Sequence, residues 1–414
     1  MAEQLTADGW VLVSAALVLF MTPGLAFFYG GMDRSRNVLN MLMMNFWCLL
    51  IIPIAWVVIG YSIAGGDFDA GWFGGFDAAF LGNLNLTSQA GVDELLLVAF
   101  LGMFAVITPA LISGAVADRM KFSAWAIFAP VWMLLVFAPV FKWVYGGWLG
   151  VRGSLDFAGG TAIHVNAGIA ALVAVLILGK RKGWPGEGHP PHSMPLVMIG
   201  TGILWFGWFG FNAGSSLAAD GTAVQAFMNT FLAAAAAGLA WAVIERIKDR
   251  HFTNLGAASG IVAGLVAITP AAGYVSSMSS IFIGLAAGVI CCFAVQIKFK
   301  AGYDDALDVV GVHFVGGLVG SLAIGLFADA EYFGAEHMSG LFYGGGATLL
   351  LEQAIANGVT IVYSGIVTAL ILLALKYTIG IRVSEEVEAT GLDIAEHAET
   401  GYNLGESFME RSVV

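Results

Sequence analysis

The sequence has little charge. Only 11% of its 414 residues are Asp, Glu, Lys or Arg, and 59% are hydrophobic, whereas an ordinary soluble domain carries about 25% charged residues. A folded surface with so few charges would not stay dissolved in water. Long apolar stretches also recur along nearly the whole chain. The composition therefore predicts an integral membrane protein.

Cysteine is also scarce. Cys48, Cys291 and Cys292 all fall within apolar segments, so they provide neither a disulfide framework nor the spacing of a zinc site. Basic residues are outnumbered, because 17 Lys and Arg stand against 29 Asp and Glu, for a net charge of −12. That balance argues against nucleic-acid binding. We expect no metal, no organic cofactor and no enzymatic activity.

The chain is built from apolar segments. Eleven of them each hold about the twenty residues that cross the hydrocarbon core of a bilayer. Their approximate bounds are 9–31, 38–63, 94–117, 122–145, 158–179, 195–217, 221–244, 255–274, 275–296, 307–328 and 350–376. We therefore predict an all-α integral membrane protein with eleven transmembrane helices in a domain of residues 1–378.

The positions of lysine and arginine predict the orientation of these helices. If the N-terminus is outside, fifteen of the seventeen basic residues fall on the cytoplasmic side, and Lys142 and Arg152 fall outside. Cytoplasmic loops are enriched in basic residues. The pattern therefore favours an N-out, C-in protein in the cell (inner or plasma) membrane, in contact with lipid throughout.

Residues 379–414 follow the last span and form an acidic tail. The segment "EEVEATGLDIAEH" spaces acidic and apolar residues in a way that suits a short helix or turn. The basic cytoplasmic loops would attract it electrostatically. We predict a cytoplasmic regulatory tail; the alternative is a solvated acidic end without a partner.

Two histidines lie inside apolar spans at matching places. His164 lies early in the fifth span and His313 early in the tenth; Asp156 precedes the first by eight residues and Asp308 the second by five. Glycine follows each histidine within four residues. An offset of five spans means that the two halves run in opposite directions, which is typical of an inverted repeat with its site near the bilayer midplane. We therefore predict a 5+5 inverted repeat plus one peripheral helix.

An ionisable side chain inside a span is costly and usually functional. One alternative is that each histidine makes a single interhelical hydrogen bond. Another is bis-histidine haem ligation, but the spans offer no internal Arg or Lys for the propionates. In an apolar pore desolvation keeps both imidazoles neutral, so that each offers one donor and one acceptor. Such a pair suits a small hydrogen-bonding molecule and suits a bare metal cation poorly.

Several motifs are similar to those of the ammonium transporter (Amt/methylammonium permease) branch of the Amt/Rh superfamily. They are "FFYGGMDRSRNVLNM" (27–41), "ISGAVADRMKFSA" (112–124), "LDFAGGTAIHVNAG" (155–168), "GWFGFNAGS" (207–215), "DVVGVHFVGGLVG" (308–320) and "GIRVSEEVEATGLDIAEH" (380–397). The resemblance covers almost the whole chain. The stretches 155–168 and 207–215 are the most specific, and the second favours Amt over Rh.

The resemblance implies site residues. His164 and His313 resemble the twin histidines of the pore, and Phe104 and Phe211 resemble the stacked aromatic gate. Trp208 and Ser215 resemble members of the external recruitment site, whose vestibule Phe100 would line. Asp156 resembles the carboxylate needed for ammonium recruitment or deprotonation, with Asp308 as its inner counterpart.

The sequence departs from the family pattern at the end of the fourth span. The family usually has Trp in a "VWGGG" context, but this chain reads "WVYGGW", which places Tyr145 at the equivalent position. Tyrosine offers a weaker cation–π face than tryptophan; Trp143 or Trp148 is the alternative source of the ring. Asp156 also suits an N-cap at the helix that carries His164, and Asp308 has the same alternative.

The predicted function is transport of ammonium into the cytoplasm, with methylammonium as an analogue. Ammonium would be recruited outside, lose its proton near the phenylalanine gate, and pass the histidines as ammonia. The resemblance further implies a homotrimer and a PII-type signal protein as a cytoplasmic partner. The alternative is an ammonium sensor that conducts weakly and signals through the tail.

Overall fold

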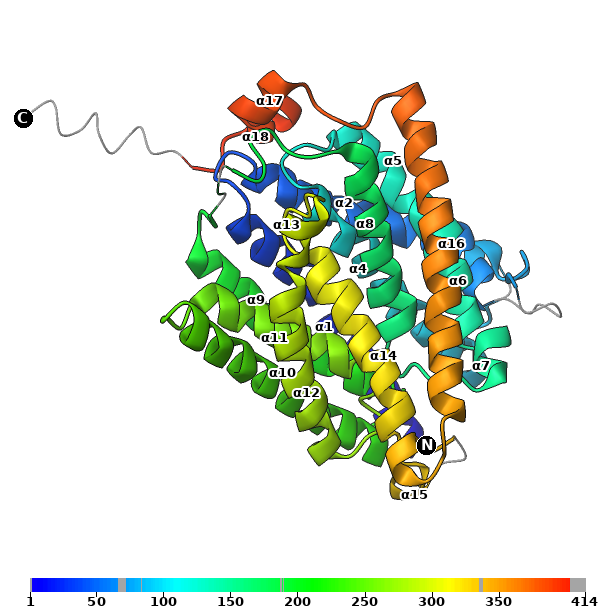
Figure 1. The fold of residues 1–414 in the computed structure, drawn as a ribbon. Helices are drawn as coiled ribbons and strands as arrows, with labels where there is room; N and C mark the ends of the chain where they lie inside the picture. Colours follow the sequence, from blue (N-terminus) through cyan, green and yellow to red (C-terminus); the bar gives the residue numbers. More distant parts are fainter. Residues whose placement is uncertain are drawn as a thin grey trace, which may run out of the picture.

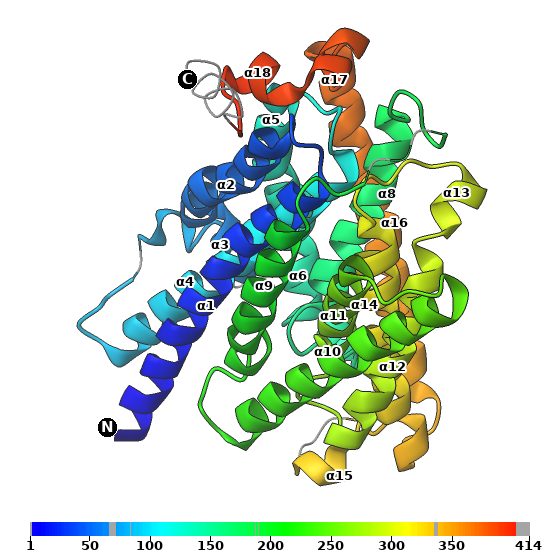
Figure 2. The same cartoon turned by 90° about the vertical axis from the view of Figure 1, so that its left-hand side faces the viewer.

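The protein is an all-helical bundle (Figure 1). The computed structural model describes residues 2–65, 72–82, 84–186, 188, 190–334 and 338–402, and within these ranges it contains no strand, only an isolated antiparallel bridge between Met120 and Arg382. The N-terminus and α15 (Ala330–Phe333) lie at one end of the bundle. The short tail helices α17 (Glu385–Thr390) and α18 (Leu392–His397) lie at the other end (Figures 1 and 2).

Ten helical stretches in the described chain are long and apolar enough to cross a membrane. Six contain one unbroken long α-helix, namely α1 (Ala2–Met32), α4 (Gln89–Val116), α9 (Met194–Gly214), α10 (Gly221–Lys248), α12 (Ser277–Ala294) and α16 (Thr348–Thr378). α12 continues after a short break into α13 (Ile297–Ala301). The remaining short 3₁₀ turns are η2 (Ala79–Leu81) and η6 (Leu341–Tyr343).

The other four stretches contain a wider, π-helical turn. They are α2 (Val38–Ala55) with η1 (Trp56–Gly60) and α3 (Tyr61–Gly65); α5 (Phe122–Trp132) with η3 (Met133–Phe137), α6 (Ala138–Val144) and α7 (Trp148–Arg152); η4 (Gly160–Val165) with α8 (Asn166–Leu178); and η5 (Val310–Phe314) with α14 (Val315–Phe327). Such turns are rare and often mark functional sites. Both histidines singled out in the sequence lie on one, His164 on η4 and His313 on η5.

The span predicted at 255–274 is shorter than expected. α11 (Asn254–Ile268) has 15 residues and ends two residues before Pro270, which has no amide hydrogen to continue the helix. The chain then turns back, and the Pro270 carbonyl accepts a hydrogen bond from the Phe157 amide at 3.0 Å. A Cβ added to Gly160 would lie 2.3 Å from the Pro270 ring. The proline loop therefore packs directly on the start of the turn that carries His164.

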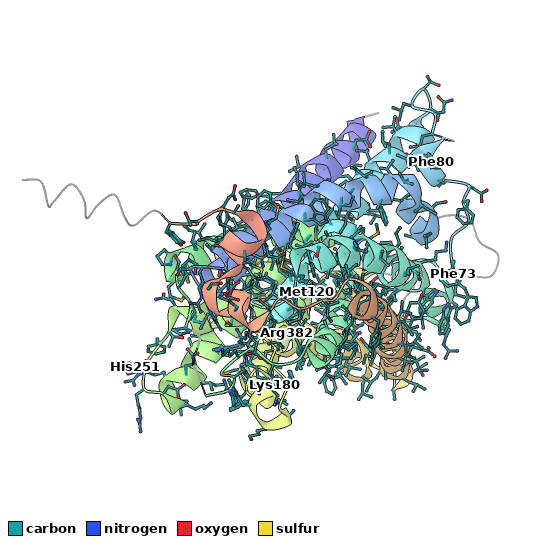
Figure 3. All side chains as sticks on the ribbon, turned by 90° about the horizontal axis from the view of Figure 1, so that it is seen from above. Phe73, Phe80, Met120, Lys180, His251 and Arg382 are labelled. Carbon is teal, nitrogen blue, oxygen red and sulfur yellow. The ribbon has the colours of Figure 1, made fainter. Side chains whose placement is uncertain are left out.

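The tail lies against the loops at its end of the bundle. The Lys121 amide donates to the Ile381 carbonyl at 3.0 Å, and the Val383 amide donates to the Arg119 carbonyl at 3.1 Å. Met120 and Arg382 of the tail form an antiparallel bridge, and Figure 3 labels the two residues close together. Residues 403–414 of the predicted tail lie outside the described residues.

Candidate transport site

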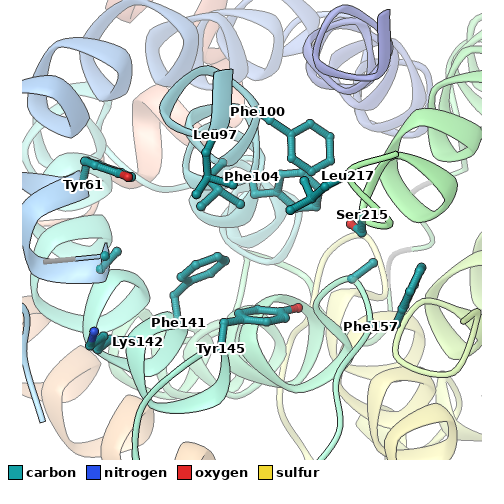
Figure 4. A pocket seen from close by; sticks show the side chains of 14 residues that line it. Tyr61, Leu97, Phe100, Phe104, Phe141, Lys142, Tyr145, Phe157, Ser215 and Leu217 are labelled. Atoms are coloured by element: carbon teal, nitrogen blue, oxygen red, sulfur yellow. The ribbon is translucent and has the colours of Figure 1, made fainter. Parts of the chain in front are cut away.

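An aromatic pocket of about 360 Å³ opens near the ends of α4, α6 and α9. Phe100, Tyr145 and Ser215, which the resemblance assigned to the external site, line it together with Phe104, which the resemblance assigned to the gate (Figure 4). The Phe100 and Phe104 rings meet edge to face, with centroids 4.9 Å apart. Tyr145 lies on the opposite wall, with its ring 4.5 Å from that of Phe141. The pocket thus presents several π faces to whatever enters it.

Ser215 adds one polar group to this pocket. Its hydroxyl donates to the Phe211 carbonyl at 2.8 Å, one turn back on α9. Because the hydroxyl proton is used in that bond, the oxygen lone pairs remain to accept a hydrogen bond. An acceptor beside π faces suits a small cation that can donate hydrogen bonds.

A pair of phenylalanine rings forms the floor of the aromatic pocket. The ring centroids of Phe104 and Phe211 lie 4.4 Å apart, with their planes tilted by 40°. Both side chains are buried, at 3% and 1% exposure. Phe104 lines the aromatic pocket, whereas Phe211 lines a second and much smaller cavity with His164 and His313. The ring pair therefore separates two compartments, as expected of a gate.

The smaller compartment, which we call the histidine cavity, is lined by apolar side chains around the two imidazoles. Its volume is about 10 Å³, close to the minimum that holds one water-sized molecule. The His164 and His313 Nδ1 atoms are 3.2 Å apart, and the ring planes differ by 17°. One Nδ1 must therefore carry a proton while the other accepts it.

The position of Trp208 differs from the prediction. The indole does not belong with the recruitment residues but stacks on His164, with centroids 5.5 Å apart and planes 19° apart. Its Nε1 donates to Thr269 Oγ1 at 2.7 Å. The reason is helical rise: Trp208 precedes Ser215 by seven residues of α9, which places it about 10 Å deeper along the same face.

The two histidine-bearing helices cross closely and reciprocally. Gly168, four residues after His164, packs on the backbone of Phe314; an added Cβ would lie 2.6 Å from its amide nitrogen. Gly317, four residues after His313, packs on Gly160 and His164; an added Cβ would lie 3.0 Å from the Gly160 carbonyl oxygen. A side chain at either position would push the helices apart, so these glycines permit the contact between the imidazoles.

Asp156 caps the turn that carries His164. Its carboxylate accepts hydrogen bonds from the amides of four consecutive residues, 159 to 162, at 2.7 to 3.0 Å. These bonds satisfy the amides that a helix start leaves unpaired. The capping interpretation of Asp156 therefore agrees with the structure.

The equivalent residue before His313 is Asp305 rather than Asp308, which corrects the sequence interpretation. Asp305 precedes His313 by eight residues, as Asp156 precedes His164, and it accepts the Val310 amide at 2.7 Å. Asp308 instead has a left-handed backbone (φ 63°) and pairs with Lys298 Nζ at 2.7 Å. Matching the nearest acid to each histidine paired acids eight and five residues away and missed this equal spacing.

Asp308 lines a third compartment, a charged pocket of about 240 Å³. Its ionisable lining residues are Asp33, Arg34, Asp118, Arg181, Lys298 and Asp308. Sequence reasoning missed Tyr29 as a site residue; along α1 it follows Leu25, which lines the histidine cavity, and precedes Met32, which lines the charged pocket. The Tyr29 hydroxyl donates to the Leu111 carbonyl at 3.1 Å and lies 3.4 Å from His313 Nε2. Tyr29 falls within the quoted motif 27–41, which is the signal that could have found it.

The sequence and the fold of this chain are similar to those of known proteins. The sequence profile of the Ammonium Transporter Family matches residues 9–402. An ammonium transporter of Mycobacterium tuberculosis is 50% identical over 95% of this chain and 90% of its own length. The crystal structure of Saccharomyces cerevisiae Mep2 superposes with a TM-score of 0.85 at 33% identity, over 92% of this chain and 88% of that chain. The chain belongs to the ammonium transporter family.

A further structure similar to this ammonium transporter is named a sensor Amt protein. It superposes with a TM-score of 0.88 at 28% identity, over 96% of this chain and 99% of that chain. The predictions of a multi-pass protein of the plasma membrane and of a transporter rather than an enzyme are confirmed by the family and its relatives.

The structure also distinguishes between the aromatic rings near the end of α6 in this transporter. Tyr145 lines the aromatic pocket. Trp143 and Trp148 pack instead with Trp72, at centroid distances of 5.8 and 5.4 Å, and the Trp143 indole donates to the Trp72 carbonyl. Of these three rings, Tyr145 is therefore the one that lines the aromatic pocket.

The tail of the transporter makes more backbone contacts than charge contacts. Glu388 is 1% exposed, accepts the Lys182 amide at 2.6 Å and pairs with Arg382 at 2.8 Å. On α18, the Asp393 carboxylate accepts the Asn40 amide at 2.8 Å, and the Phe122 amide donates to Glu396 at 3.1 Å. The tail therefore docks through carboxylate oxygens that accept hydrogen bonds from backbone amides elsewhere in the chain.

Two of the loop cations expected to attract the tail are neutralised elsewhere. Arg181 pairs with Asp118 and Asp304, each at 2.8 Å, and Lys298 pairs with Asp308. Burial by itself would raise the pKa of Asp118, but hydrogen bonding to Asp33 and the charges of Arg181 and Arg34 lower this pKa overall. Lys182, another cation of these loops, does contact the tail: its Nζ lies 3.9 Å from Glu385 Oε2.

Proposed function

We propose that this transporter moves ammonium into the cytoplasm by binding it in the aromatic pocket, removing its proton at the Phe104–Phe211 pair, and passing ammonia between His164 and His313. One observation carries the proposal: two phenylalanine rings separate a pocket of about 360 Å³ from a cavity of about 10 Å³ that holds paired imidazoles. The first compartment suits a cation, and the second suits a small neutral molecule.

Recruitment rests on π faces and one acceptor. Phe100, Phe104 and Tyr145 surround the site with rings, and the Ser215 oxygen supplies a hydrogen-bond acceptor. A cation over an aromatic face gains about 0.5–2 kcal/mol, and more as it is desolvated. Potassium has similar attraction to π faces but cannot donate a hydrogen bond to Ser215.

Deprotonation follows from the cost of moving charge. Taking a small ion from water into a medium of low dielectric costs of order 20 kcal/mol in the idealised case, and the Phe104–Phe211 pair offers it no compensating charge. Ammonium can give its proton to a water molecule of the aromatic pocket, from which the proton returns to the solvent outside, and continue as ammonia, whereas potassium has no neutral form. A narrow apolar passage thus excludes metal cations by solvation energy.

The histidine pair then gives ammonia polar contacts within an apolar passage. In the Nδ1–Nδ1 hydrogen bond one ring is the donor and the other the acceptor, so the two Nε2 atoms keep opposite hydrogen-bonding capacities. His164 Nε2 has no protein hydrogen-bond partner among the described residues. A passing ammonia molecule can use such groups as donor and acceptor.

We assign the two carboxylates indirect roles. The four amides that Asp156 caps occupy its oxygens, so that it acts on the incoming cation through its charge and by holding the His164 turn. Asp308, paired with Lys298 at the charged pocket, would act where the product or a proton leaves. Neither carboxylate is assigned direct contact with ammonium.

The proposed topology has eleven spans, with α11 as the short one, an N-out, C-in orientation, and two inverted five-helix halves followed by α16. Support comes from the first helix starting at the end opposite the tail (Figure 1). It also comes from the reciprocal contacts of Gly168 and Gly317. The first feature is expected of an odd number of spans, and the second is expected of halves related by an axis in the membrane plane.

The direct experiment is uptake of labelled methylammonium into proteoliposomes that contain the full chain, with unlabelled ammonium as competitor. We expect saturable uptake that ammonium inhibits. Lack of uptake by correctly assembled protein would contradict the proposal.

The second candidate function is an ammonium sensor that binds but conducts weakly. It is favoured by the similarity to a protein named a sensor Amt and by the Tyr29 hydroxyl, which lies 3.4 Å from His313 Nε2 and occupies the hydrogen-bonding site of that nitrogen. Measurement of current on addition of ammonium separates the two: a sensor binds ammonium with negligible current.

We further propose a homotrimer and a regulatory role for the tail, with a PII-type protein at the cytoplasmic face as the partner. The buried contacts of Glu388 and Asp393 support a specific docked state. Deletion of residues 383–414 tests the tail when transport is assayed with and without cytosol. Transport equal to that of the full chain under both conditions would mean that the tail is not regulatory.

A further inference from the structure

A group of four polar side chains lies within the membrane-spanning part of the bundle, outside all three compartments. Thr161 belongs to η4, Ser321 to α14, and Gln353 and Asn357 to α16. All four are buried, at 0–2% exposure. We call this group the polar node. It joins the helix of His164, the helix of His313 and the last membrane-spanning helix.

The polar node contains a closed ring of three hydrogen bonds. The hydroxyls of Thr161 and Ser321 are 3.0 Å apart. Thr161 donates to Asn357 Oδ1 at 3.2 Å, and Asn357 Nδ2 donates to Ser321 Oγ at 2.7 Å. With Ser321 donating to Thr161, the three bonds run in one direction around the ring. Each hydroxyl then uses its single proton once, as the chemistry of hydroxyl groups requires.

Gln353 extends the polar node to the capping turn. Its side-chain amide makes two bonds to one residue, accepting from the Leu155 amide at 2.7 Å and donating to the Leu155 carbonyl at 2.8 Å. Leu155 directly precedes Asp156. The same Gln353 nitrogen lies 3.0 Å from the Ser321 carbonyl oxygen. The node therefore fixes the backbone on which the Asp156 cap is built.

The polar node lies one turn from the contact between the imidazoles. Thr161 precedes His164 by three residues, so the two are neighbours along the same helix. Gly317, on the same helix as Ser321, packs on His164 itself. Polar groups that are fully bonded inside a low-dielectric interior hold one arrangement and disfavour others. A displacement of the Thr161–Ser321 pair would move the two histidine helices relative to each other.

The opposite half of the repeat lacks an equivalent. The positions that correspond by their offset from the histidines are Val310, three residues before His313, and Leu172, eight residues after His164. Both are apolar. Polar bonding is therefore concentrated at one end of the crossing, where α16 covers it. A requirement for general helix association would not explain this one-sided placement.

We propose that Thr161, Ser321, Gln353 and Asn357 are positioning residues, which set the separation and ring orientation of His164 and His313 through helix placement without contacting ammonium. The inference rests on the proposed function for its consequence, because the spacing of the imidazoles matters for selectivity when they line the pathway. Sites that are supported loosely lose function through displacements of about 1 Å.

The test uses Thr161→Val and Asn357→Leu in proteoliposomes of the full chain, with Thr161→Ser as the conservative rescue. Thr360→Val is the matched control. Thr360 is also a fully buried threonine, on the same helix α16, but its hydroxyl has no protein partner among the described residues. We expect the first two variants to lower the ratio of methylammonium uptake to potassium leak by about tenfold, while Thr161→Ser and Thr360→Val keep the wild-type ratio.

A second measurement does not depend on transport. Solid-state NMR of ¹⁵N-histidine reports the ring nitrogens, and His164→Ala and His313→Ala assign the two pore rings. We expect Thr161→Val and Asn357→Leu to shift these two ring signals, with no shift in Thr360→Val. The polar node acts as a unit, so the effects of two changes within it should not add. The double variant with Thr161→Val and Ser321→Ala should therefore change the selectivity ratio no more than either single variant does.

The outcomes separate this inference from the proposed function. Variants with unchanged ring signals and an unchanged selectivity ratio would overturn the positioning role even if wild-type transport is normal. If the wild type does not transport, the proposed function fails, and the NMR comparison alone decides whether the node positions the rings. If Asn357→Leu does not assemble, Thr161→Val and Ser321→Ala, which each remove one hydroxyl, carry both measurements.

Discussion

His164 lies on the turn Gly160–Val165 and His313 lies on the turn Val310–Phe314; we refer to them as the His164 turn and the His313 turn. Both turns are π-helical. In each, an aspartate lies eight residues before the histidine and a glycine lies four residues after it. The surroundings differ. The His164 turn has four amides bonded to Asp156 and is joined to the polar node.

The His313 turn is held by fewer polar bonds. Asp305 accepts the Val310 amide, its Oδ1 has no protein hydrogen-bond partner among the described residues, and a tyrosine hydroxyl lies beside the imidazole. The comparison shows that the two turns share a layout but differ in how many polar bonds hold them. The His164 turn is fixed firmly beside the place where we propose that ammonium is deprotonated, and the His313 turn is held mainly by packing.

The largest expected difference between the halves concerns the two capping aspartates. Asp156→Ala leaves four buried amides without an acceptor, at a cost of about 1–3 kcal/mol for each uncompensated donor, so we expect most of the assembled protein to be lost. Asp305→Ala should cost far less. Thermal unfolding of the purified variants measures this, and equal losses would remove the proposed difference in rigidity.

The next effect concerns the histidines themselves. His164→Ala or His313→Ala removes one member of the Nδ1–Nδ1 pair and leaves the other imidazole without its partner. We expect either a blocked pore or one that leaks cations, with a change of tenfold or more in the ratio of methylammonium uptake to potassium current. Wild-type uptake with unchanged selectivity in both variants would exclude the role of the pair.

A smaller effect tests the half that carries His313. Tyr29→Phe removes the hydroxyl beside His313, and we expect the maximal uptake rate to change by about two- to fivefold, the equivalent of one modest hydrogen bond. The half-saturating concentration should stay constant because Tyr29 lies away from the aromatic pocket. Tyr363→Phe is the control, because it removes a hydroxyl that donates to the Leu135 carbonyl outside the pathway. Equal effects of the two changes would argue against a role for Tyr29.

The smallest expected effect lies in the aromatic pocket. Tyr145→Trp should lower the half-saturating concentration of external ammonium and Tyr145→Ala should raise it, each by about two- to fivefold, because the π contribution differs by about 0.5–1 kcal/mol at a partly exposed site. Competition of ammonium with methylammonium uptake measures these values. If all three proteins give the same half-saturation, position 145 does not belong to the binding site.

Much of the site could be predicted because its residues lie in short motifs on long helices. The residue pattern itself singled out the two histidines. The resemblance to the ammonium transporters added Phe104, Phe211, Phe100, Tyr145 and Ser215, and the structure brings these residues to the two neighbouring compartments. Trp208 was placed too near the surface because a motif gives neighbours in sequence and not depth along the helix. Asp308 was matched to Asp156 because a list of nearby acids does not show which carboxylate reaches the free amides.

Other features depend on contacts between distant parts of the chain. The polar node joins Thr161 to residues 160 to 196 positions away, and such pairings leave no local pattern. The span predicted at 255–274 ends early at Pro270, whose loop packs on Gly160. The predicted attraction between the tail and the basic loops gave the right location, but buried amide contacts rather than exposed charges provide most of the docking.

The central claim is that the passage through the histidine cavity admits ammonia and excludes metal cations. The most direct test is to compare fluxes in proteoliposomes of the wild-type protein under equal inward gradients of ammonium and of potassium, at the same membrane potential. The account predicts flux that depends on ammonium, with potassium flux at the level of protein-free liposomes. Potassium flux comparable to that of ammonium would contradict the account, because a metal cation is not expected to pass between the Phe104 and Phe211 rings.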